Sequence, residues 1–122
     1  MVIPLDENFL VFHYADRIKA FIIEALRILD FYLELEGSEE LEKLMLQILN
    51  SCKKEVSLAK SICSKIDWTR PYLMEASLKI EDGINYFVVE NHESLKENFR
   101  LALSKMTTCA AKAQDRMEDK VF

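Results

Sequence analysis

The sequence predicts an all-α fold, an antiparallel up-down-up-down four-helix bundle that forms a single domain over residues 1–122. Helix breakers are scarce, since the 122 residues include only two Gly and two Pro. Apolar residues recur three and four positions apart in four long segments, which is the period of an amphipathic helix, and no segment alternates like a strand. Because the segments are joined by only a few residues, sequence neighbours must run antiparallel.

The first helix is predicted over residues 8–36, a segment without Gly or Pro. Gly37 suits the position just after a helix, where a left-handed backbone is common, and Ser38 suits the N-cap of the next helix. The first helix is therefore expected to end near Glu36.

The second helix is predicted from residue 39 to about residue 66. Glu39, Glu40 and Glu42 lie in its first turn, where the positive end of the helix dipole favours acids. An apolar stripe then runs from Leu41 to Ile66. The segment "DWTRP" interrupts the pattern, and either Asp67 or Thr69 is a candidate cap for the third helix.

The third and fourth helices are predicted on either side of Asn91. The third runs from about Pro71 to Glu90. Gly83 in its interior lowers helix stability by about 1 kcal/mol relative to Ala, so a kink at this residue is an open alternative. The fourth carries an apolar stripe from Leu95 to Met117. Both stripes repeat every three or four residues, as a helix buried along one face requires.

The first helix has more apolar circumference than one bundle can bury. Only four of the sixteen residues from Ala20 to Leu35 are charged, and large apolar residues also fall among the charges. Exposed apolar patches mark interfaces, so self-association or a protein partner is expected at this helix. The expected interface residues are Phe12, Ile23, Phe31 and Leu35. Alternatively, residues 1–5 cover this surface within one chain.

Charge is divided unevenly between the two ends of the predicted bundle. Residues 30–45 and 81–97, which meet at one end, carry a net charge of −9, whereas the whole chain carries −5. We call this end the acidic pole. A ligand- or cation-binding bundle that uses this pole is an alternative function, although most acidic surfaces are simply solvated.

A second candidate surface combines basic and aromatic residues near the break after the second helix. Its members are Lys53, Lys60, Lys65, Trp68 and Arg70. Such a surface could make this protein an accessory subunit of a nucleoprotein complex. The negative net charge disfavours nucleic acid, however, and Trp68 can instead close the end of the bundle.

No motif for catalysis, a cofactor or a metal is recognisable, and a non-enzymatic protein is expected. The two histidines and three cysteines lack the spacing of metal ligands, and two distant glycines cannot form a phosphate loop. Cys52, Cys63 and Cys109 are expected to be reduced thiols in the cytoplasm. The stretch "MVIPLDENF" lacks the features of a signal peptide, and no membrane association is expected.

Overall fold

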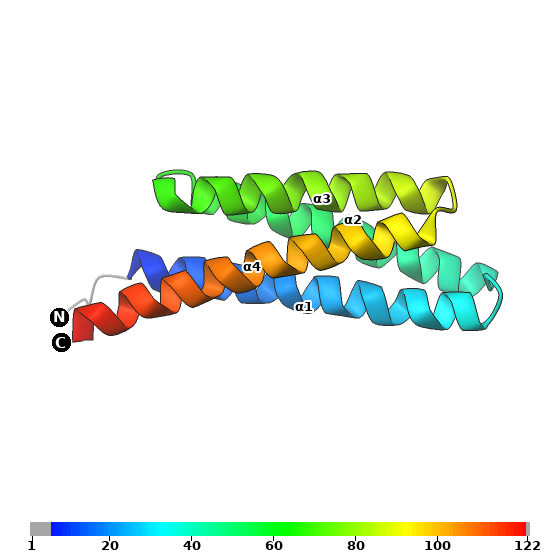
Figure 1. Ribbon diagram of the computed structural model, residues 1–122, viewed down its shortest axis with the longest axis horizontal. Coiled ribbons are helices and arrows are strands. Elements are labelled where there is room, and N and C mark those ends of the chain that lie inside the picture. The colour runs from blue at the N-terminus through cyan, green and yellow to red at the C-terminus, as the bar shows by residue number, and fades with distance from the viewer. Residues whose placement is uncertain (1–5, 122) are drawn as a thin grey trace.

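The computed structural model describes the backbone of residues 6–121 and the side chains of residues 6–117. Four helices follow one another as α1 (Glu7–Glu34), α2 (Glu39–Ile62), α3 (Arg70–Val88) and α4 (His92–Val121), and a short 3₁₀ helix, η1 (Asp67–Thr69), precedes α3. Successive helices run in opposite directions, so α1 begins and α4 ends at the same end of the bundle (Figure 1). The predicted antiparallel four-helix bundle is confirmed.

One apolar core joins the four helices. Helix α1 packs on α4 and α2, while α3 packs on α4 and less extensively on α2. The largest fully buried side chains include Phe99, Ile18, Ile22, Leu29 and Met106. Burying a side chain of this size stabilises the fold by about 1.5–3 kcal/mol, so these stripes determine how the helices pack.

Gly83 allows α3 and α4 to approach each other closely. Helix α3 continues through this glycine, which is buried in the interface. A Cβ atom at Gly83 would lie 2.4 Å from Cε1 of Phe99, far inside van der Waals contact. The glycine that the sequence marked as a weak point therefore provides room for a core aromatic ring.

Helices α1 and α3 end in the same way, each with a glutamate in the left-handed region. Glu36 has φ of 52° and Glu90 has φ of 61°. The following amides close the turn, as the N–H of Gly37 donates to the carbonyl of Tyr32 at 2.9 Å and that of Asn91 to the carbonyl of Tyr86 at 2.8 Å. This is the Schellman arrangement, in which Gly usually takes the position that Glu36 and Glu90 occupy. The prediction that Gly37 holds this position is off by one residue, although Gly37 itself is left-handed as expected, with φ of 75°.

The connection between α2 and α3 also differs from the prediction, because α2 ends at Ile62 and not near residue 66. The hydroxyl of Thr69 donates to the carbonyl of Ile66 at 2.7 Å, which stabilises the turn. Of the two predicted cap candidates, Thr69 occupies the N-cap position of α3, but its side chain forms no capping hydrogen bond. Asn91 does cap α4, since its side-chain oxygen accepts from the N–H of Ser94 at 3.2 Å.

Candidate functional site

The candidate site is the side of α1 that faces away from the core. Since α2 and α4 cover its flanks, this side is left to solvent, and over its second half α1 lies along the lower edge of the bundle in Figure 1. We define the outer face of α1 by the residues Phe9, His13, Asp16, Ala20, Ile23, Arg27, Asp30, Phe31 and Glu34, all of them exposed.

Three of the four predicted interface residues are exposed in the structure. The exposed fraction is 38% for Ile23, 58% for Phe31 and 63% for Leu35, which directly follows α1. Phe12 is half-buried and packs against the core. The alternative, in which residues 1–5 cover this surface, lies outside the described residues.

Phe9 is an exposed aromatic of the outer face that the sequence analysis did not select. Its side chain is 50% exposed, and its ring lies parallel to that of His13, with 6.4 Å between the ring centres. Phe9, Asp16 and Ile23 follow one another at intervals of seven residues, which places them in one row along the helix. That spacing could have identified Phe9 as a residue of the outer face.

An ion pair fixes α1 against α2 beside the outer face. The guanidinium of Arg17 donates to both carboxylate oxygens of Glu55, which is almost completely buried. The hydrogen bond and the charge of Glu55 raise the pKa of Arg17 above its usual value. Next to this pair, a shallow hollow of about 400 Å³ opens between the helices and is lined by Arg17, Ala20, Phe21, Glu24 and Ile48.

At the acidic pole, aromatic rings close the end of the core. Tyr32 meets Phe87 and His92 edge to face, with 5.5 and 5.7 Å between ring centres. Nδ1 of His92 is buried without a hydrogen-bond partner among the described residues. Burial, together with the carboxylates of Glu42 and Glu90, raises the pKa of Tyr32.

The acidic pole does not gather its carboxylates into a metal site within the part of the chain that the structure describes. Among residues 6–117, no three His, Cys, Asp or Glu side chains lie close enough together to hold an ion. Asp30 instead forms an ion pair with Lys96 of α4, with 3.5 Å between Oδ1 and Nζ. The acids of this pole are otherwise spread over the surfaces of four helix ends, as a solvated pole requires.

The basic and aromatic residues collect at the opposite pole, where α4 adds two cations that the sequence analysis missed. Lys112 lies over the ring of Tyr72 at 5.1 Å, and Arg116 lies over the ring of Trp68 at 4.7 Å. Trp68 is half-buried against the core, as expected of a residue that closes the end of the bundle. Contacts of this kind, which join α4 to α3 and to η1, cannot be predicted from spacing along one chain segment.

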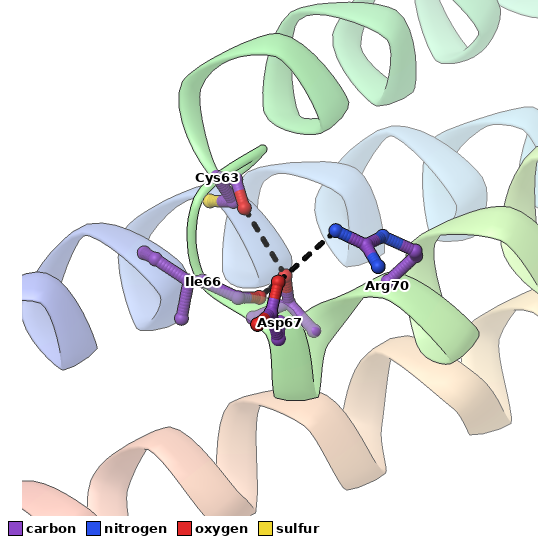
Figure 2. A network of polar contacts seen from close by, with 5 residues as sticks. Cys63, Ile66, Asp67 and Arg70 are labelled. Atoms are coloured by element: carbon purple, nitrogen blue, oxygen red, sulfur yellow. Dashed lines mark hydrogen bonds and ion pairs between the residues drawn. The ribbon is translucent and has the colours of Figure 1, made fainter.

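The five predicted members of this basic cluster do not form one compact site. Lys65 and Trp68 line a cleft of about 640 Å³ with Arg116. Lys60 and Arg70 line a separate cavity of about 320 Å³ between α2 and α3. Arg70 forms an ion pair with Asp67, with 3.0 Å between Nη2 and Oδ1 (Figure 2). Lys53 lies two helical turns before Lys60 on α2.

All three thiols are buried and unpaired. Burial raises the pKa of Cys52 to about 12. Burial, together with the neighbouring thiol of Cys63, raises the pKa of Cys109 to about 12. Thiols with such pKa values stay protonated at neutral pH, and the protonated form is neither a good nucleophile nor a good metal ligand.

No described helix is long and apolar enough to cross a membrane. The chain matches no protein-family model, and comparison with curated proteins and solved structures gives no significant match. Function therefore has to be argued from the geometry of this chain alone.

Proposed function

We propose that the protein acts by association, as a homodimer or a small subunit of a larger assembly, through the outer face of α1. The observation that supports this proposal is the exposure of Ile23 and Phe31 on the helix that contacts both α2 and α4, and of Leu35 directly after it. Each large apolar side chain left in water forgoes about 1.5–3 kcal/mol. Burial against a second chain recovers part of that free energy, in proportion to the area that each side chain still exposes.

The length and chemistry of this face suit an interface. Twenty-eight residues of helix extend over roughly 42 Å, enough to contribute to an interface of standard size. Phe9 and Phe31 place an aromatic residue at each end, and aromatic residues are enriched in the buried cores of interfaces. The ion pair between Arg17 and Glu55 holds the helix in place before association.

The proposal includes a reducing, cytoplasmic location. It is supported by the three free cysteines, all buried in the core. Disulfides form readily in oxidising compartments, so small proteins found there usually pair their cysteines. Association through apolar contacts on α1 requires no disulfide between chains.

The test is the mass in solution by light scattering. The native chain is expected at twice the 14.2 kDa of one chain, and the Ile23→Glu, Phe31→Glu double variant is expected as a monomer. The matched control is Met74→Glu, Leu78→Glu, which adds the same charges to exposed apolar positions of α3. The control should remain a dimer.

Dissociation is also expected to appear in thermal unfolding. The Tm of the native chain should rise with protein concentration, because mass action favours the associated state. The Tm of the Ile23→Glu, Phe31→Glu variant should not depend on protein concentration. A native chain that is monomeric at all accessible concentrations overturns the proposed self-association.

A second candidate function is the binding of single-stranded RNA, as an accessory subunit of a nucleoprotein complex. The binding surface would be the pole opposite the acidic pole, where the basic and aromatic residues collect. This function is favoured by Lys112 and Arg116, which extend the charge around Trp68 and Tyr72. Binding to a labelled single-stranded RNA should then weaken steeply as salt increases, because released counterions drive such binding. If the protein does not bind the labelled RNA even at low salt, this function is excluded.

A further inference from the structure

We propose that the outer face of α1 pairs with α1 of a second copy in antiparallel orientation, with Asp16 of one chain opposite Arg27 of the other. This inference rests on the proposed self-association and adds its partner, orientation and register. It follows from the pattern of charges and side-chain sizes along one exposed helix face.

The outer face of α1 can be divided into two rows of positions that recur every seven residues. One row of the repeat holds Phe9, Asp16, Ile23 and Asp30, and the adjacent row holds His13, Ala20, Arg27 and Glu34. Two rows separated by three and four residues have the spacing of the a and d positions of a helix that packs along another helix, with charged or polar residues at five of the eight positions. The repeat spans four heptads, nearly the full length of α1.

In an antiparallel pair, each row faces the other row of the second copy. Placing the small Ala20 opposite the larger Ile23 fixes the register. The same register then places Asp16 opposite Arg27 and Asp30 opposite His13. A twofold axis generates each of these contacts twice, so the pairing is self-complementary.

A parallel pair would align each residue with its own copy. Asp16 would face Asp16, Arg27 would face Arg27, and Glu34 would face Glu34, and like charges opposed across an interface disfavour that arrangement. It would also bring the two acidic poles together. The antiparallel pair separates them and brings each acidic pole toward a part of the partner that carries net positive charge.

The structure leaves the required groups available. Asp16 and Arg27 are exposed, and neither forms an ion pair within residues 6–117. Ala20 lines the shallow hollow between α1 and α2, together with Phe21 and Ile48. That hollow provides an apolar surface for Ile23 of the second copy.

A charge-swap experiment tests the register. Asp16→Arg places Arg opposite Arg27, and Arg27→Asp places Asp opposite Asp16, so each single variant should dimerise roughly tenfold more weakly or worse. The double variant restores opposite charges and should recover native affinity. Asp82→Arg and Arg100→Asp, at exposed sites on α3 and α4, are the controls and should leave dimerisation unchanged.

The outcomes separate this inference from the proposed function. A monomeric native chain overturns both. A native dimer that is insensitive to the single swaps, or that the double variant fails to restore, overturns the antiparallel register and leaves the association itself standing. Circular dichroism of each variant checks that the helices are retained.

Orientation can be measured independently with a spin label at Glu34→Cys. The native thiols are buried, so labelling is confined to the new cysteine. From the helical rise, the two labels should lie roughly 40 Å apart in the antiparallel pair. They would lie about 10 Å apart in a parallel pair, the usual spacing of packed helices. A short distance therefore excludes the proposed orientation.

Discussion

Arg17 on α1 and Glu55 on α2, thirty-eight residues apart in sequence, face each other across the helix pair, with Nη2 of Arg17 lying 3.4 Å from Oε2 of Glu55. The carboxylate is buried and the guanidinium is half-exposed. A buried carboxylate requires a partner, because the protein interior solvates charge poorly. This pair therefore adds one polar contact to the apolar packing that aligns α1 with α2.

Removal of Arg17 should destabilise the fold far more than removal of an ordinary surface arginine. In Arg17→Ala, Glu55 stays buried without its partner, so the urea midpoint should fall clearly below that of the exposed control Arg100→Ala. Replacing both residues, as in Arg17→Ala with Glu55→Leu, should recover most of the loss, because no unpaired charge is left. Equal midpoints for Arg17→Ala and the control would contradict this.

Gly83→Ala should destabilise the bundle even though Ala favours helices by about 1 kcal/mol. The new methyl group would collide with the ring of Phe99, and overpacking of this kind costs about 1–3 kcal/mol. Urea unfolding measures the difference, and Asp82→Ala on the exposed side of α3 is the control. The smaller side chain of Phe99→Leu should reduce the cost of Gly83→Ala, so that the two changes are not additive.

Stability should fall as pH rises above 9. Burial raises the pKa of Cys52 and Cys109 from 9.0 to about 12, so between these values the unfolded chain has lost thiol protons that the folded chain keeps. Each thiol then lowers the free energy of unfolding by up to about 1.4 kcal/mol per pH unit. Urea unfolding at pH 7, 9 and 10 measures this slope. The Cys52→Ala, Cys109→Ala variant should show a shallower slope, and parallel curves would refute the assignment.

Arg116→Gln should change the fluorescence of Trp68, the single tryptophan of the chain. The guanidinium lies over the indole ring, a contact worth about 0.5–1 kcal/mol at an exposed site. Lys112→Gln is the matched control, since Lys112 lies over Tyr72. An emission spectrum that responds equally to both variants would show that the contact with Arg116 is not formed in solution.

The fold could be predicted from the sequence because the helices are long and strongly periodic. The stripe from Leu95 to Phe99 and Met106 is wholly buried, as its spacing requires. The helix ends were less predictable. Glu36 is left-handed as well as the predicted Gly37. The turn after Ile62 depends on a hydrogen bond from the Thr69 hydroxyl, which no local sequence pattern predicts.

The candidate site was predictable in part. The excess apolar width of the first helix identified Ile23 and Phe31, because exposure on one helix follows from its own periodicity. The partners across helices were not predictable in this way. Glu55 opposite Arg17, and Arg116 over Trp68, are brought together only by the packing of the bundle.

The two glutamates in left-handed turns have a consequence for where the molecule opens first. Glu36 and Glu90 each follow the carboxyl end of a helix at the same pole, where the backbone disfavours both a side chain and a negative charge. Amide protons near residues 33–37 and 87–91 should therefore exchange with solvent sooner than those beside Trp68. Breathing motions of the bundle would begin at the acidic end and leave the tryptophan-capped end closed.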